Sequence, residues 1–144
     1  MGSYRESEKR RFVRLPTTVS VTYRFISQVP VEGRGPHGTL RPGGSVPREV
    51  YEGQTANLAA GGMLLVGPIP DKELIADLLM QKVIVGVEMQ LDPTGAGKSI
   101  HALCRVSWVE AVEEKESRYG LGLRFVEITS AAQDEIFRYV ISNS

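Results

Sequence analysis

This sequence has few of the residues that carry out chemistry. Its 144 residues include one cysteine, Cys104, and two histidines, His37 and His101. A single cysteine excludes an internal disulfide and is typical of a reducing compartment, so we expect a cytoplasmic protein. The thiols and imidazoles are too few for a zinc-ligand spacing, and no acid–base pair stands out among the carboxylates. We therefore predict no catalytic residue, no metal site and no cofactor, and hence a protein that is not an enzyme.

Long apolar runs and net charge are also missing. No apolar stretch approaches the roughly 20 residues that span a bilayer, so we expect no membrane insertion. The N-terminal segment MGSYRESEKRRF has no apolar region behind its charges and does not resemble a signal peptide. Lys and Arg together number 17, as do Asp and Glu, and this balance predicts no DNA or RNA partner. The charge is uneven, however, because residues 5–14 hold five basic side chains and two acidic ones.

What remains is a pattern of short strands. Apolar and polar residues alternate with the two-residue period of half-buried strands. This alternation predicts about six strands, at residues 17–26, on both sides of a glycine turn within 54–66, and at 83–91, 100–112 and 119–128. In the strand at 100–112 it places Cys104 and Trp108 on the core face and Ser107 and Val109 on the other.

Helical spacing of apolar residues appears twice. It predicts a short connecting helix at 71–83 with Asp71 as its N-cap, and a C-terminal helix at 130–141 with a capping box at Ser130 and Gln133. Since most strands follow one another without a helix between them, the expected fold is mostly β. We predict a six-stranded antiparallel β-barrel closed at one end by the C-terminal α-helix.

The expected domain organisation is a flexible basic arm at residues 1–14 followed by a barrel domain at 15–144. A Gly/Pro-rich stretch at 27–51 is predicted to be a loop insertion within the barrel. Its GRGPHG segment fits G-x-G-x-x-G, but no strand precedes it and TLRPGG cannot open a helix, so we do not interpret it as a dinucleotide site.

The segment DPTGAGKS at 92–99 differs from a phosphate-binding loop by one glycine. Such a loop connects a strand to a helix whose N-terminus faces the phosphates. Here the residues after Ser99 alternate as a strand. The prediction is therefore a β-hairpin connection and not a nucleotide-hydrolysing site.

Two further motifs carry the functional hypothesis. RRFVR gives R-x-x-x-R from Arg10 to Arg14 before the first long strand, and NLAAGG runs from Asn57 to Gly62 at the glycine turn. Their order and placement resemble the PilZ domain, the bacterial receptor module for cyclic di-GMP. That family has R-x-x-x-R on an arm and [DN]-x-S-x-x-G on the barrel. The segments RLPTTVSVTYR, GGMLLV, CRVSWV and YGLGLRFVEIT resemble its strands, so the resemblance covers most of the chain from Lys9 onward.

The resemblance implies a PilZ-type barrel that senses cyclic di-GMP. It implies that Arg10 and Arg14 hold guanine and phosphate, that Arg11 adds charge, that Asn57 takes the guanine edge and that Gly62 shapes the turn. The residue types suit these roles, since a guanidinium can make two parallel hydrogen bonds to guanine or phosphate and an amide oxygen accepts from guanine N–H groups. The ligand is expected to order the arm and to create a surface for an unidentified partner protein.

Ala59 departs from the family pattern, because the family has serine at this position of the motif. Losing one net hydrogen bond costs about 0.5–1.5 kcal/mol, so we expect Ala59 to weaken ligand binding severalfold to tenfold. One alternative is a degenerate PilZ adaptor that acts only through protein–protein interaction. Another is a small nucleic-acid-binding barrel, which would need spread positive charge and exposed aromatics. Whether one ligand molecule or a stacked pair binds is left open.

Overall fold

The structure is a computed structural model that describes residues 14–16, 18–28, 48–92, 97, 99–113 and 116–143. The described residues form seven strands and two helices. In chain order these are β1 (Arg14–Leu15), β2 (Ser20–Ser27), β3 (Tyr51–Ala59), β4 (Gly62–Pro68), α2 (Glu73–Leu79), β5 (Val83–Met89), β6 (Ile100–Glu113), β7 (Arg118–Glu127) and α3 (Ser130–Asn143).

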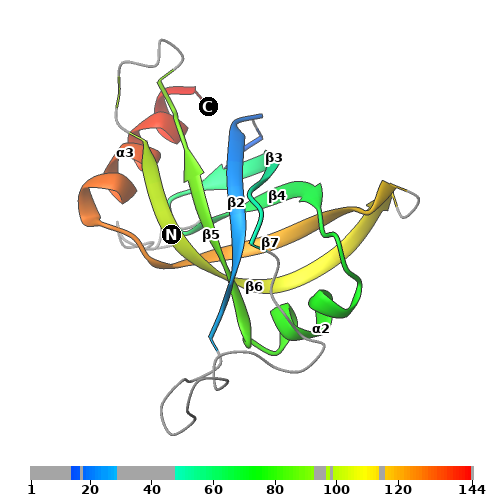
Figure 1. The fold of residues 1–144 in the computed structure, drawn as a ribbon. Coiled ribbons are helices and arrows are strands. Elements are labelled where there is room, and N and C mark those ends of the chain that lie inside the picture. The colour runs from blue at the N-terminus through cyan, green and yellow to red at the C-terminus, as the bar shows by residue number, and fades with distance from the viewer. Residues whose placement is uncertain are drawn as a thin grey trace, which may run out of the picture.

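The strands form a closed antiparallel barrel (Figure 1). Six strands make the ring in the order β3-β2-β5-β6-β7-β4, and β4 closes it by pairing with β3. The two-residue β1 lies on the edge of β3 that β2 also uses, with Arg14 opposite Ala59 and Leu15 opposite Leu58. The predicted six-stranded antiparallel barrel is therefore confirmed.

The alternating pattern of β2 fills the barrel interior. Val19, Val21, Tyr23 and Phe25 are all buried, as their two-residue spacing predicts. Thr55 is a polar residue in this core, and its hydroxyl accepts a hydrogen bond of 2.9 Å from the Val19 backbone N–H. The Thr55 N–H in turn donates to the Val19 carbonyl at 2.9 Å. This reciprocal pair satisfies backbone groups where the chain enters β2.

The connecting helix α2 is shorter than the sequence suggests. Its buried Leu74 and Leu78 face the barrel, and the Asp71 carboxylate accepts a hydrogen bond of 2.9 Å from the Glu73 N–H at its start. The predicted extension to residue 83 is wrong, because Val83 is the first residue of β5. Val83 fits both the helical spacing of the apolar residues before it and the strand pattern after it, so spacing alone does not assign it to α2 or β5.

The C-terminal helix α3 packs against β1 and β3 through buried Ile136 and Val140. Figure 1 shows it on the side of the barrel away from α2. The predicted capping box has Ser130 as the N-cap, but Ser130 is already the first residue of α3. The capping hydroxyl is that of Thr129, which accepts a hydrogen bond of 3.1 Å from the Ala132 N–H. Gln133 instead donates to the Ala60 carbonyl. Among the described residues, no helix is long and apolar enough to cross a membrane.

Strand β6 corrects the prediction for Trp108. The register with β7 pairs Val106 with Leu123 but Trp108 with Gly122, so Ser107 is an extra residue in a β-bulge. Because side chains alternate between the two faces of a strand, one extra residue moves the side chains that follow it to the opposite face. Trp108 is consequently 42% exposed on the outer surface, whereas Val109 packs against the core.

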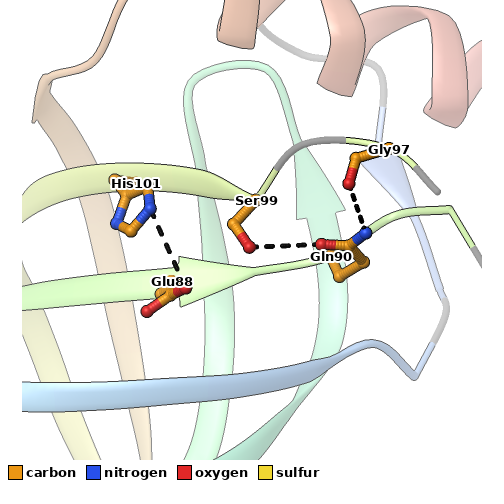
Figure 2. A network of polar contacts seen from close by, with 5 residues as sticks. All are labelled: Glu88, Gln90, Gly97, Ser99 and His101. Atoms are coloured by element: carbon orange, nitrogen blue, oxygen red, sulfur yellow. Dashed lines mark hydrogen bonds and ion pairs between the residues drawn. The ribbon is translucent and has the colours of Figure 1, made fainter. Parts of the chain in front are cut away.

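The DPTGAGKS segment connects two antiparallel strands, as predicted. Strands β5 and β6 pair directly, with Met89 opposite Ile100. Figure 2 shows the base of this hairpin, where the Gln90 amide donates to the Gly97 carbonyl at 2.6 Å and accepts from the Ser99 hydroxyl at 3.2 Å. A strand begins directly after Ser99, so this segment does not have the strand–loop–helix arrangement of a phosphate-binding loop.

Candidate functional site

The two sequence motifs meet at the turn between β3 and β4. Asn57 and Ala59 end β3, Gly62 begins β4, and the Arg14 backbone pairs with Ala59 from β1. The end of R-x-x-x-R and the N-L-A-A-G-G motif are thus on adjacent strands although 45 residues separate Arg14 from Ala59. Only the backbone of Arg14 is described. Arg10 and Arg11 lie outside the described residues, so their roles stay predictions.

A surface hollow of about 390 Å³ lies over this turn. We call it the Asn57 hollow. Strands β3, β4, β6 and β7 and the start of α3 contribute its walls. Its lining includes Asn57, Ala59, Gly62, Trp108, Arg124 and Gln133. The hollow therefore contains all three motif residues predicted from the β3–β4 hairpin. It also includes side chains outside the sequence motifs, among them Trp108, Arg124 and Gln133.

Asn57 enters the hollow from an irregular part of β3. The β3–β4 register shifts between Thr55 and Asn57, which makes Ala56 an extra residue and sets Asn57 opposite Leu64. The Asn57 side chain is half-buried, and it has no hydrogen-bond partner within the part of the chain that the structure describes. A half-buried amide beside a hollow is available to bind a polar ligand edge.

The turn itself is held from two sides. The Phe125 N–H of β7 donates to the Gly61 carbonyl at 2.9 Å. The Gln133 amide of α3 donates to the Ala60 carbonyl at 2.8 Å. These bonds fix the backbone of the motif before any ligand arrives, and a fixed backbone lowers the entropy cost of binding.

The close packing of strands requires glycine at position 62, independently of any ligand. A Cβ built on Gly62 would lie 2.1 Å from the Leu123 carbonyl oxygen and 3.2 Å from the Arg124 Cα. Strands β4 and β7 approach here more closely than any side chain permits. Ala59 across the turn is 5% exposed, which leaves little free surface at the position where the family has serine.

Trp108 covers a second glycine on the floor of the hollow. A Cβ on Gly122 would lie 2.3 Å from Trp108 Nε1, so the indole ring lies directly over the Gly122 backbone. The ring is held on one face by β7 and is 42% exposed. Sequence reasoning missed this residue because the bulge at Ser107 is invisible in local alternation. The weak signal for it was the glycine at 122, which leaves room for a large cross-strand neighbour.

Two arginines stand side by side near the hollow. Arg105 of β6 is opposite Arg124 of β7, and Arg124 is in turn opposite Gly62 of β4. Both arginines are exposed, and neither has an ion-pair partner among the described residues. Like charges directly opposite one another on a sheet destabilise the pair. The arrangement favours an anion beside Arg124.

A larger hollow, of about 490 Å³, lies elsewhere on the barrel. Residues of β2, β5 and β6 line it, among them Gly86, Glu88 and His101. His101 Nε2 and Glu88 Oε2 are 3.8 Å apart (Figure 2). Of the predicted site residues whose side chains the structure describes, Asn57, Ala59 and Gly62, none lines it. Size alone therefore does not locate the motif-bearing site.

Neither thiol nor metal chemistry is available in the described structure. Burial raises the pKa of the Cys104 thiol to about 12, so the thiol is protonated and unreactive at neutral pH. Within the described ranges, no three His, Cys, Asp or Glu side chains gather as a metal site would require. The Asn57 hollow offers amide, guanidinium and indole groups, which can form hydrogen bonds or stack on a flat ring.

Comparisons with known proteins agree with this architecture. Among solved structures, the chain is similar to the Bacillus subtilis inhibitor of motility (MotI/DgrA), with a TM-score of 0.61 and 16% identity. That match covers 92% of this chain and 50% of the other, so this chain spans half the length of that protein. It is also similar to the PilZ domain with c-di-GMP of YcgR from Escherichia coli, with a TM-score of 0.51 and 11% identity over 94% and 91% of the two chains. At these identities the likeness concerns the fold.

No curated protein sequence matches the chain significantly. The model of one protein family, described as PilZ domain, matches residues 8–142. The match includes both motifs, all seven strands and nearly all of α3. With the barrel closed as predicted and the two motifs on adjacent strands, the chain belongs to the PilZ domain family.

Proposed function

We propose that this domain binds cyclic di-GMP in the Asn57 hollow, next to the end of the arginine arm. One observation carries the proposal. The backbone of Arg14 pairs with Ala59, and Ala59 lines the Asn57 hollow, so the end of R-x-x-x-R lies on the strand next to the hairpin motif. A solved PilZ domain with c-di-GMP, that of YcgR, has the same fold.

The described side chains suit a ligand with two guanines and two phosphates. The Asn57 amide, which has no partner among the described residues, complements the donor edge of a guanine. The indole of Trp108 offers a flat face for a base, and such stacking contributes about 1–3 kcal/mol per base. Arg124 supplies charge for a phosphate or for guanine O6 and N7. All three groups line the Asn57 hollow.

The signal is proposed to pass through the arm. In this mechanism, the side chains of Arg10, Arg11 and Arg14 close over the ligand, and the arm that precedes β1 becomes ordered against the barrel. The ordered arm and the hollow's rim then form a new surface for a partner protein. Trypsin cleavage after Arg10 and Arg11 tests this step, since the ligand is expected to slow it. Cleavage at equal rates with saturating ligand would refute the arm-ordering step while leaving binding intact.

Calorimetric titration with cyclic di-GMP tests binding itself. Arg14→Ala removes a charge-assisted bond of about 1.5–3 kcal/mol, so the Kd is expected to rise roughly 10- to 100-fold. Asn57→Ala removes a neutral bond of about 0.5–1.5 kcal/mol and should raise the Kd about 2- to 10-fold. The matched control is Arg118→Ala, because Arg118 lies in the β6–β7 hairpin next to Glu113 and outside the Asn57 hollow. Its Kd should stay unchanged.

The absence of the family's serine at Ala59 favours one competing function, that of an adaptor that binds only protein. If wild-type protein that is folded shows no heat of binding in the tens of micromolar, the ligand-sensing proposal fails and the domain acts as a protein-binding adaptor. Ala59→Ser separates the two further. Restoring the family's hydroxyl should hold or raise affinity at a working site, whereas an adaptor gains no affinity from it.

A further inference from the structure

Gln81 has an uncommon backbone conformation at the end of α2. Its φ is 65°, in the left-handed region. The Gln81 N–H donates to the Leu78 carbonyl at 3.2 Å and the Lys82 N–H donates to the Asp77 carbonyl at 2.9 Å, which together make a Schellman helix end. Glycine is the usual residue at this position because a Cβ strains the left-handed conformation. The helix end alone therefore does not explain a glutamine.

The glutamine side chain crosses from α2 to strand β6. Its Nε2 donates to the Val106 carbonyl at 3.0 Å, and its Oε1 is buried without a hydrogen-bond partner in the described part of the chain. Both the left-handed backbone and the unpaired oxygen lower stability. A residue that destabilises the fold twice points to a function that its side chain performs.

Val106 is the last residue before the bulge that turns Trp108 outward. The register of β5 with β6 ends at Cys104. Beyond it, the Gln81 amide at the end of α2 donates to the Val106 carbonyl, next to the residue where the β6–β7 register shifts. If the extra residue moved along β6, Trp108 would return to the core face, since one residue reverses the alternation. The bond from Gln81 thus holds the β6 backbone at the residue just before this shift.

We propose that Gln81 is a positioning residue that fixes the β6 bulge and so holds the Trp108 indole in the Asn57 hollow. It acts through the backbone of Val106 and does not line the hollow itself. This links the C-terminal end of α2 to a site on the other side of β6. Its ligand readout rests on the proposed cyclic di-GMP site, whereas the orientation of Trp108 can be measured without any ligand.

The ligand-free test uses the fluorescence of Trp108, the only tryptophan in the chain. In Gln81→Gly, the Trp108 emission maximum and its quenching by acrylamide should both change. The thermal midpoint should stay within a few degrees of wild type, because glycine relieves the left-handed strain and offsets the lost hydrogen bond. The matched control is Ser117→Gly, which relieves the other left-handed non-glycine residue among those described, with a φ of 55°. It should leave Trp108 emission unchanged.

The ligand test is a double-mutant cycle with cyclic di-GMP. Gln81→Gly should raise the Kd about fivefold or more, the lower range of a lost stacking contact. In a Trp108→Phe background, Gln81→Gly should change the binding free energy by at most half as much as in wild type, because Gln81 acts through the indole. Unaltered Trp108 emission and quenching in folded Gln81→Gly, or an equal effect of Gln81→Gly in both backgrounds, would overturn the proposal.

This design separates failure of the proposed ligand binding from failure of the proposed role of Gln81. If wild type does not bind the ligand, the proposed function fails and the fluorescence comparison still decides the role of Gln81. If Gln81→Gly unfolds, Gln81→Asn repeats the test, since asparagine tolerates the left-handed region and is one carbon shorter. Unaltered Trp108 emission in folded Gln81→Asn would equally overturn the proposal.

Discussion

Replacing Gly62 by alanine tests whether the motif glycine is required by the sheet or by the ligand. The added Cβ would lie 2.1 Å from the Leu123 carbonyl oxygen, whereas real Cβ atoms essentially never approach closer than 3.0 Å. The obstacle is backbone of the paired strand β7, so no side-chain rotation can relieve it. Strands β4 and β7 must separate locally, and the closed barrel resists that movement on both sides.

The expected cost comes from these contacts. Overpacking typically costs about 1–3 kcal/mol, and a lost ladder hydrogen bond adds about 0.5–1.5 kcal/mol. We therefore expect Gly62→Ala to lower the free energy of unfolding by about 2–4 kcal/mol, out of the roughly 5–15 kcal/mol of an ordinary domain. For a chain of this size, that corresponds to a fall in Tm of about 5–15 °C.

Urea unfolding monitored by circular dichroism measures this loss, with Gly120→Ala as the matched control. Gly120 lies on β7 as well, but its added Cβ would meet Glu110 Cγ and Leu64 Cδ1 at 3.5 Å, an ordinary contact distance. Gly120→Ala should therefore leave stability within about 0.5 kcal/mol or raise it slightly. A loss below about 0.5 kcal/mol in Gly62→Ala, or equal losses in the two variants, would refute the close-approach argument.

Three further perturbations have expected outcomes. Gly122→Ala should displace the Trp108 ring, raising the Kd for cyclic di-GMP about 5- to 50-fold with a stability loss under about 1 kcal/mol, and unchanged affinity would contradict stacking on that ring. Thr55→Val leaves the buried Val19 N–H without its hydroxyl acceptor and should cost about 1–3 kcal/mol in urea unfolding, so a neutral result would show that another acceptor replaces it. Because burial raises the pKa of the Cys104 thiol to about 12, the unfolded chain loses this proton first, and stability should fall by about 1.4 kcal/mol per pH unit above roughly pH 9. Cys104→Ala should show a smaller fall between about pH 8 and 10, and equal falls in both proteins would contradict the linkage.

Much of the fold is determined by local pattern. The period-two alternation of residues 17–26 predicts the buried set of β2 because side chains on a strand alternate faces wherever pairing is regular. The same argument separates the DPTGAGKS hairpin from a phosphate-binding loop, since the chain continues from Ser99 into a strand. Boundaries were less predictable, as Val83 shows, because it suits both the end of α2 and the start of β5.

The candidate site divides in the same way. The order of the two motifs, and the position of Asn57, Ala59 and Gly62 at a hairpin turn, follow from the local sequence, because turn residues and strand alternation are local properties. That Trp108 and Arg124 join them follows only from the assembled barrel. One extra residue in β6 reverses the face of Trp108, and the register across β4, β6 and β7 sets Arg124 beside Gly62. Bulges and registers are properties of paired strands, so no single segment of sequence contains them.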